Sequence, residues 1–431
     1  MRASVLYALL PLTNVAWGEA QATKTPSENP ASKTCPWNPT IQKLRPPACA
    51  SPDLIRRVVL PSTSSRQRQQ QEQQEKEEEE EGAPGGWHGP EHCVNGTCVF
   101  SNAAASGGIA LITSPRHARI IQGYGGLSAA SHDDGGGGAH PPPFRAEQIP
   151  GKGVGLRADR PIAKGEVLLV RAPTLVAQVD ALGELEPGTR DQMYAVAMAR
   201  LPRARRDAFL AQMGRDVHAK IDINSFQLYV HGAGEKGTSH LTCYPDVARL
   251  NHDCRPNVHY RITNATITAL AARDILSGEE LTVSYIDVFL LSRQRKERIR
   301  SWGFECACAL CQGPKNETVA SDKRLRRIAQ LKEDLNNFKE VKVTAETGAE
   351  YTALHEEEGL HAHLGSAYTR AALNSALFGD EGRSRAYALR AAEELDLEKG
   401  PESGDARAMR ALADDPRAHW TWGKRRKLDE K

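Results

Sequence analysis

Short runs rich in apolar residues dominate the middle of the chain and predict β-strands. Two of them, 154–158 and 166–171, alternate apolar with polar residues, which is the pattern of a strand that buries one face. The other predicted strands lie at 98–100, 108–113, 226–230, 258–262, 267–271 and 280–285. Ala163-Lys164-Gly165 stands between the two alternating runs and predicts a turn between two strands.

Apolar residues at helical spacing predict helices in two further parts of the chain. Within 181–220, one helical face carries Met193, Val196, Ala197 and Leu201. Beyond residue 312, helical patterns occupy 323–339, 360–377 and 383–397. Many short strands with one helical insert predict an α+β domain, not a parallel α/β one, and a helical region follows it.

Two low-complexity stretches interrupt these patterns. Gln67–Glu81 is rich in Gln and Glu and ends in five consecutive glutamates, whose charge predicts a solvated linker. A second break runs from four glycines at 135–138 to three prolines at 141–143 and marks a domain boundary or a surface insertion. The mean hydropathy of -0.51 also predicts that part of the chain is disordered.

The first residues have the pattern of a secretory signal peptide. Arg2 precedes a short, largely apolar stretch at 3–12, and small residues at 16 and 18 fit a cleavage site. The stretch is too short to span a membrane, and no other span is predicted. We therefore expect residues 1–20 to be a signal peptide; the alternatives are a disordered apolar leader or a misassigned start codon.

The charge of the chain is nearly balanced. A formal net charge of +2 gives no support to direct nucleic-acid binding. One basic stretch stands out, formed by Arg293, Arg295, Lys296, Arg298 and Arg300. We expect this stretch to be a solvated helix face; the alternative is a surface that contacts an acidic partner or chromatin.

Nine cysteines fall into two groups. The N-terminal group is Cys35, Cys49, Cys93 and Cys98. Four cysteines behind a signal peptide predict two disulfides, with three pairings open. The second group is Cys243, Cys254, Cys306, Cys308 and Cys311.

The last three cysteines form a Cys-x-Cys-x-x-Cys motif on one tight loop. Three converging thiolates need a cation, because their mutual repulsion and desolvation are otherwise severe. Zinc prefers four soft ligands at such spacings, so a fourth ligand must come from elsewhere. The sequence offers Cys254, Cys243 and, less well, His252. The alternative is a disulfide plus a free thiol.

Four motifs together resemble the SET domain of protein lysine methyltransferases with its zinc-binding post-SET segment. They are the glycine-rich 151–158, the polar turn 251–257, the Gly-Glu-Glu-Leu-Thr-Val-Ser-Tyr run at 278–285 and the thiol motif at 306–311. Each motif alone is weak evidence for this family, since a glycine-rich turn or a single His in a loop is common in proteins. The ending from Gly303 onward and the helical tail are similar to the SET-and-MYND group, although no MYND-type cluster is seen.

The resemblance implies a site for S-adenosylmethionine and one for zinc. The cofactor-binding residues would be Lys152, Gly153, Val154, Gly155, Asn251, His252, Tyr285 and Phe304. The zinc ligands would be Cys254, Cys306, Cys308 and Cys311. Tyr285 would be the catalytic residue, with its hydroxyl directed toward the path of the methyl group to orient the attacking amine.

The implied function is S-adenosylmethionine-dependent transfer of a methyl group to a lysine of a protein substrate, histone or non-histone. The alternative is a catalytically inactive SET-fold module that keeps the zinc and binds other proteins. We expect a monomer without membrane or direct nucleic-acid contacts. The location stays open, because the leader indicates the secretory pathway and the resemblance indicates the nucleus or cytoplasm.

These expectations divide the chain into six parts. They are a signal peptide (1–20), a disordered Gln/Glu-rich segment (21–86), a cysteine-containing segment with a Gly/Pro linker (87–143), the SET domain (144–286), the post-SET zinc segment (287–315) and a helical region with a basic tail (316–431).

Overall fold

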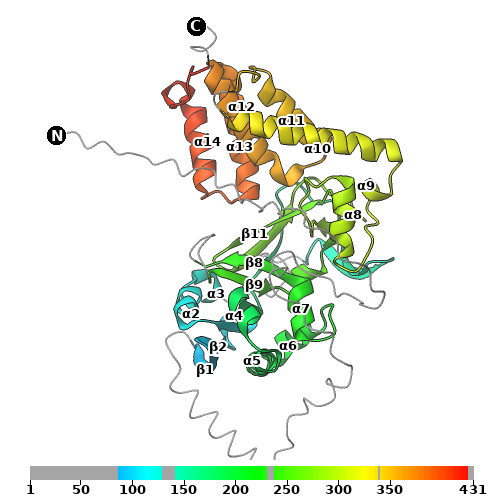
Figure 1. Ribbon diagram of the computed structural model, residues 1–431, viewed down its shortest axis with the longest axis vertical. Coiled ribbons are helices and arrows are strands. Elements are labelled where there is room, and N and C mark those ends of the chain that lie inside the picture. The colour runs from blue at the N-terminus through cyan, green and yellow to red at the C-terminus, as the bar shows by residue number, and fades with distance from the viewer. Residues whose placement is uncertain (1–85, 129–140, 231–236, 338–339, 426–431) are drawn as a thin grey trace, which may run out of the picture. The chain divides into compact units, whose positions relative to one another are not determined.

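The computed structural model describes residues 86–128, 141–230, 237–337 and 340–425 of the chain (Figure 1). The predicted signal peptide, most of the Gln/Glu-rich segment, Cys35 and Cys49 lie outside these residues. Among the described residues, no helix combines the length and the apolar composition that a membrane crossing needs.

The strands of the described residues form three sheets. The six-stranded sheet has the order β1 (His88–Val94), β2 (Thr97–Asn102), β3 (Ile109–Thr113), β7 (Leu175–Gln178), β9 (Ser239–Cys243) and β8 (Ser225–Tyr229). The four-stranded sheet is ordered β10 (Asn251–His252), β13 (Glu280–Val283), β5 (Gly153–Ala158) and β4 (Phe144–Ile149). The third is ordered β11 (Val258–Thr263), β12 (Thr266–Ala271) and β6 (Val167–Arg171).

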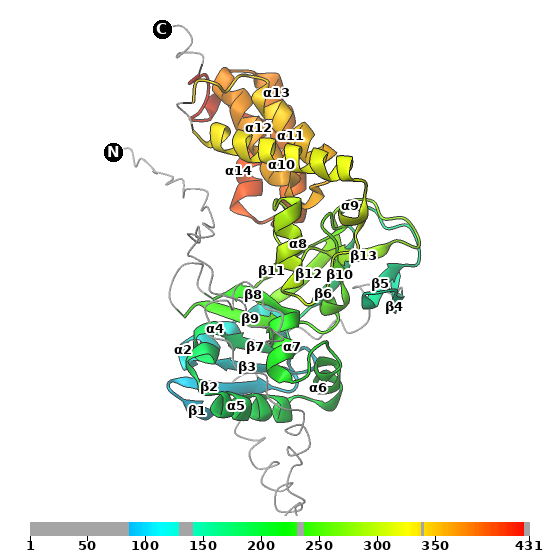
Figure 2. The ribbon, with the colours of Figure 1, turned by 45° about the vertical axis from the view of Figure 1, so that its right-hand side comes forward.

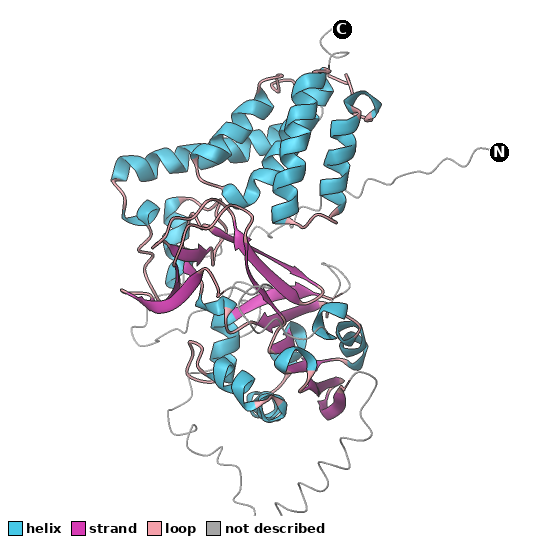
Figure 3. Ribbon diagram, turned by 180° about the vertical axis from the view of Figure 1, so that it is seen from behind, coloured by secondary structure: helices cyan, strands magenta, loops and turns pink. Residues whose placement is uncertain are grey.

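The helices fall into three groups along the chain. Figure 3 shows all of them in cyan. The first two are α2 (Pro115–Gln122) and α3 (Gly125–Ser128). The insert contains α4 (Val179–Glu184), α5 (Pro187–Arg200), α6 (Arg203–Leu210) and α7 (Val217–Asn224). The rest are α8 (Ser292–Arg300), α9 (Ala309–Gln312), α10 (Lys315–Asn336), α11 (Thr347–Glu357), α12 (Leu364–Phe378), α13 (Glu381–Glu398) and α14 (Gly404–Asp414). Single 3₁₀ turns are η4 (Ala105–Gly107), η5 (Val247–Arg249), η6 (His361–His363) and η7 (Pro416–Ala418).

The predicted α+β class is confirmed, and the helical region after residue 312 is present. The helical pattern at 181–220 is resolved into four short helices, because Pro187 and Pro202 each stand where a new helix begins. The six-stranded sheet joins β1–β3 to β7–β9, so it crosses the predicted boundary at residue 144.

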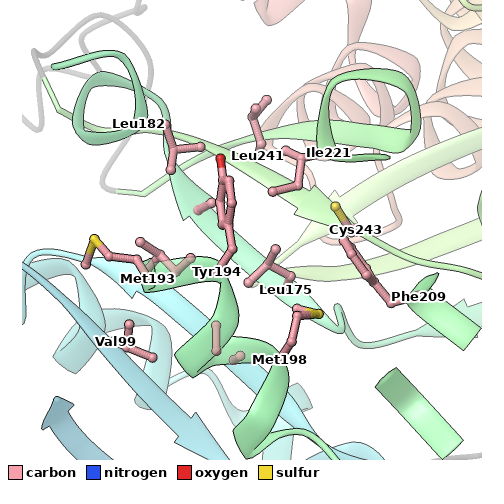
Figure 4. Close-up of a cluster of buried hydrophobic side chains, with 14 of the residues drawn as sticks. Val99, Leu175, Leu182, Met193, Tyr194, Met198, Phe209, Ile221, Leu241 and Cys243 are labelled. Atoms are coloured by element: carbon pink, nitrogen blue, oxygen red, sulfur yellow. The ribbon is translucent and has the colours of Figure 1, made fainter. Parts of the chain in front are cut away.

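Both faces of the six-stranded sheet are buried, which explains why its central strands read as continuous apolar runs. One face packs against the insert in a cluster that includes Val99, Ile112, Leu175 and Tyr194 (Figure 4). The other face packs against α2 and α3 through neighbouring residues of the same strands, such as Phe100. Successive side chains therefore enter different cores.

The strands at 154–158 and 166–171 are both present, but they do not pair with each other. β5 pairs with β4 in a hairpin and with β13 on its other side, whereas β6 pairs with β12. The turn between them is tied elsewhere, since the Gly165 N–H donates to the Ala271 carbonyl at 2.8 Å. The predicted strand, turn and strand are thus present, and each of the two strands pairs with a strand far along the chain. Figure 2 gives a second view of these strands.

The last helices pack on one another in chain order and meet the strand-rich part at several points. His259 on β11 is 2.9 Å from the Glu398 carbonyl at the end of α13, and Arg261 donates to the Leu397 carbonyl at 3.0 Å. Lys164 forms an ion pair with Glu394. The helical region is therefore bound to the sheet that carries β11.

Of the four N-terminal cysteines, Cys93 and Cys98 are joined in a disulfide. They lie at the ends of β1 and β2, which form a hairpin with Asn95 and Gly96 at its tip. Both tip residues have positive φ, which Asn and Gly adopt most readily.

A buried polar group lies inside the insert. Asp222 on α7 is 3.6 Å from the Nε2 atom of His218, and the Nδ1 atom of His218 is 3.0 Å from the Tyr194 hydroxyl. Burial raises the pKa of Asp222 to about 7 and lowers that of His218 to about 4. Folding therefore disfavours the charged form of both groups.

We predict that Asp222→Asn stabilises the protein at alkaline pH. Because the folded pKa of Asp222 lies above the unfolded value, the wild type loses stability as the pH rises from about 4 to about 7. The variant escapes this loss, so its free energy of unfolding should exceed that of the wild type by about 1–3 kcal/mol at pH 8 and match it near pH 4. Urea unfolding at both pH values measures this.

The exposed Asp207 on α6 provides the matched control, because Asp207→Asn should change stability little at either pH. A difference between Asp222→Asn and the wild type that does not grow with pH would contradict the burial argument.

Candidate functional site

Four cysteines from two distant segments meet in the structure. Cys254 follows β10, and Cys306, Cys308 and Cys311 flank or lie within α9. Their sulfur atoms all lie within 4.8 Å of one another. The sulfur of Cys254 is 3.8 Å from that of Cys306 and 3.6 Å from that of Cys311. None of the four forms a disulfide, so the alternative of a disulfide with a free thiol is wrong.

The donor set fits a tetrahedral zinc ion. At a zinc–sulfur distance of about 2.3 Å, tetrahedral geometry separates the sulfurs by about 3.8 Å. The fourth sulfur belongs to Cys254, whereas Cys243 lies on β9 in the core beneath the insert. Hydrogen bonds from Cys254 and Cys306 lower the pKa of Cys308, whereas hydrogen bonds with the other thiols raise the pKa of Cys254, so the four thiols titrate as one coupled group.

The predicted cofactor turn is organised around a carboxylate. Glu280 on β13 accepts a hydrogen bond from the side-chain amide of Asn251 at 2.9 Å. Its other oxygen lies 2.6 Å from the Lys152 ammonium in the turn between β4 and β5. The Glu280 side chain thus holds together Lys152 and Asn251, which are 99 positions apart in the sequence.

Gly155 is required for this close approach. A Cβ atom at Gly155 would lie 2.6 Å from the side-chain nitrogen of Asn251 and 2.6 Å from Ile149. Both distances are below any normal contact, so a side chain would push Asn251 away from Glu280. Gly153 has a φ of +78°, which turns the chain into β5, and Val154 is exposed.

His252 connects the turn to the tyrosine. β10 pairs in parallel with β13, and the Nδ1 atom of His252 accepts a hydrogen bond from the backbone N–H of Tyr285 at 3.1 Å. The two rings are 5.4 Å apart. Burial lowers the pKa of His252 to about 4, so its imidazole is neutral at physiological pH.

Tyr285 lies two residues beyond the end of β13, although the sequence pattern extended the strand to it. Its hydroxyl donates to the Leu250 carbonyl at 2.9 Å, and burial raises its pKa. The ring is 5.0 Å from Trp302 and 6.4 Å from Phe304. Phe304 is 36% exposed, and its ring lies 6.3 Å from that of His252.

Three residues of this region were not predicted from sequence. Glu280 stands inside the 278–285 motif, and Trp302 stands two residues before Phe304. Arg295 was assigned to a solvated helix face, but it is only 1% exposed, whereas its neighbours Arg293 and Lys296 are exposed. That part of the prediction is wrong, because Arg295 shares the buried side of α8 with Ile299 one turn later.

Comparison with known proteins agrees with this geometry. Residues 153–286 match the family model of the SET domain. The chain is 31% identical over 130 residues to the human histone-lysine N-methyltransferase SMYD3, covering 30% of this chain and 29% of that protein. It is 24% identical over 294 residues to the histone-lysine N-methyltransferase set5 of Schizosaccharomyces pombe, covering 64% of this chain and 85% of that protein. The chain thus carries a SET domain like those of lysine methyltransferases.

We predict that the four-cysteine cluster holds about one zinc ion per chain. Cys308→Ser should lose most of this zinc, because a serine hydroxyl is a poor ligand at this position. Cys243→Ser is the matched control, since Cys243 is also a buried free cysteine but lies outside the cluster. Elemental analysis of purified proteins gives the ratio; full zinc in Cys308→Ser would contradict the assignment.

Proposed function

We propose that this protein is an S-adenosylmethionine-dependent methyltransferase that acts on a lysine of a protein substrate. The observation that carries the proposal is the convergence of Lys152, Asn251 and Tyr285 on one surface of the SET domain, through Glu280 and His252. The curated relatives named above are lysine methyltransferases, and this supports the same reaction class.

The cofactor would be held by residues that the resemblance implies. When bound, S-adenosylmethionine supplies a methyl group on a sulfonium centre. The turn from Lys152 to Gly155 would accommodate it through its backbone, since Gly155 leaves space that a Cβ would fill. Asn251 and His252 would contact it next, and the partly exposed ring of Phe304 suits a stacked adenine.

Tyr285 orients the substrate amine in this mechanism. Because burial raises its pKa, the hydroxyl stays protonated at physiological pH and does not act as a base. The Leu250 carbonyl accepts a hydrogen bond from this hydroxyl and fixes its direction, which leaves the lone pairs of the hydroxyl oxygen for an amine N–H. The lysine must arrive neutral, and burial among aromatic rings lowers a lysine pKa.

Zinc would connect the two halves of the site. Cys254 is two residues from His252, and Cys306 is two residues from Phe304. A metal bound by both thiolates fixes the cofactor turn against the segment that covers it. We also propose that the zinc-binding post-SET segment occupies residues 287–315, as inferred from the sequence.

The substrate protein is proposed only as a class. The names of the relatives mention histone lysines, and a further relative, human SMYD2, is named an N-lysine methyltransferase and is 34% identical over 96 residues. Both histone and non-histone lysines therefore enter the proposal. The alternative, an inactive SET-fold module, keeps the zinc and the fold but transfers no methyl group.

We predict that the wild type transfers labelled methyl groups from S-adenosylmethionine to protein lysines. Tyr285→Phe should lower the turnover at least about tenfold, because the substrate lysine amine is no longer oriented by the hydroxyl. Cofactor affinity should change little, since the ring remains in place. Single-turnover transfer and cofactor binding by calorimetry measure the two quantities separately.

Tyr229→Phe on β8 is the matched control, because it removes a hydroxyl from an exposed tyrosine outside the site. Cofactor binding without any methyl transfer by the wild type would favour the inactive module. Unchanged turnover in Tyr285→Phe would remove its role while leaving the enzyme class intact.

A further inference from the structure

Arg295 is an unusual residue because it is a fully buried cation. It lies on α8, is 1% exposed, and donates one hydrogen bond from Nη1 to the Leu290 carbonyl at 2.7 Å. Within the described residues, its Nε and Nη2 atoms are buried and have no hydrogen-bond partner. A guanidinium is always charged and presents five donors, so this placement is costly without a nearby anion.

The four-cysteine cluster lies beside this arginine. Ile299, one turn later on α8, belongs to the same buried cluster as Cys254 and Cys306, and Leu290, which accepts the hydrogen bond from Arg295, packs against that cluster. Arg295 is also close enough to Cys311 for the two groups to interact electrostatically. The unsatisfied donors of Arg295 therefore lie on the same buried side of α8 that faces the thiol cluster.

A second donor is left unsatisfied at the same place. The indole Nε1 atom of Trp302 is buried and has no partner within the described residues, and the Trp302 ring packs against the same cluster. Tryptophan can only donate, as arginine can. Two donor-only side chains without acceptors, next to four sulfur atoms, indicate a buried anion that the thiols provide when they are ionised.

The charge of a zinc-loaded cluster supplies that anion. Four thiolates and one divalent zinc ion leave a net charge of two minus in a buried position, which is unfavourable without compensation. One arginine reduces the net charge to one minus, and N–H donors around sulfur stabilise thiolate ligands in the way that outer partners of metal ligands do.

We propose that Arg295 is the counter-charge of the four-cysteine metal centre and that Trp302 supplies a further N–H donor to it. The proposal rests on the zinc site of the proposed function. Arg295 is a positioning residue here: it touches neither substrate nor cofactor, and it acts by holding the ionised thiols and, through them, the cofactor turn.

The test compares full-length wild type with Arg295→Met, Arg295→Gln, Arg295→Lys and Trp302→Phe in competition with a chromophoric zinc chelator. Both neutral variants should bind zinc about 10- to 100-fold more weakly, as expected for loss of a partner of the metal ligands. Arg295→Lys, which keeps the charge, should fall in between. Trp302→Phe should weaken binding roughly two- to tenfold.

Arg293→Met is the matched control, because Arg293 lies on the exposed side of the same helix. Its zinc affinity should equal that of the wild type. Cobalt-substituted proteins give a second readout, since loss of the counter-charge should shift the thiolate-to-cobalt charge-transfer band in Arg295→Met and leave it in place in Arg293→Met.

Urea unfolding separates this role from simple packing. Metal-free Arg295→Met should be at least as stable as the metal-free wild type, because it no longer buries an uncompensated charge. Zinc should then stabilise the variant less than it stabilises the wild type. A packing role predicts the same loss of stability with and without zinc, and that result would overturn the proposal.

The outcomes also distinguish this inference from the zinc site itself. A wild type that takes up no zinc overturns both together. A wild type that binds zinc no more tightly than Arg295→Met and Arg295→Gln overturns the role of Arg295 alone and leaves the four-cysteine site standing.

Discussion

The convergence of four thiols is the constraint on which the rest of the site depends. Cys254 and Cys306 are 52 positions apart in sequence, yet their sulfurs are 3.8 Å apart. Four ionised thiols would repel one another at this distance, so a cation such as the proposed zinc ion would stabilise the arrangement. Cys254 and His252 belong to the same turn, and the rings of Trp302 and Phe304, near Cys306 in sequence, lie beside those of Tyr285 and His252. Loss of the proposed metal would therefore also disturb the arrangement of these rings.

The residue after Cys254 extends this constraint to the helical region. Arg255 forms an ion pair with the buried Glu358 at the end of α11, and Glu358 also accepts hydrogen bonds from Ser321 and Arg324. Burial alone would raise the pKa of Glu358, but these donors hold it below its usual value. Three donors satisfy the carboxylate, so the contact fixes one arrangement of the helices against the turn. The helical region is thus tied to the residue that directly follows Cys254.

The sequence predicted the local elements better than their partners. Short runs rich in apolar residues marked β5, β6 and β12 correctly, but the pairing of β6 with β12 depends on a turn at Gly165 that bonds to Ala271 far along the chain. Likewise, spacing could not choose between Cys243 and Cys254 as the fourth sulfur. β9 directs Cys243 into the core of the insert, and this is a property of the sheet order, which no local pattern encodes.

The burial of Arg295 could not be predicted from the sequence either. Charged residues occupy nearly every face of α8, so the helix has no clear apolar face. Only the spacing of four between Arg295 and Ile299 marks its buried side. Once α8 is placed against the thiols, the charges divide into two regions. With zinc bound, the thiol cluster would concentrate negative charge on sulfur, for which the proposed counter-charge is Arg295. In the proposed cofactor region His252 is neutral, Tyr285 is protonated and Lys152 is paired with Glu280. A cationic ligand such as a sulfonium would therefore meet no unpaired positive charge among these three groups.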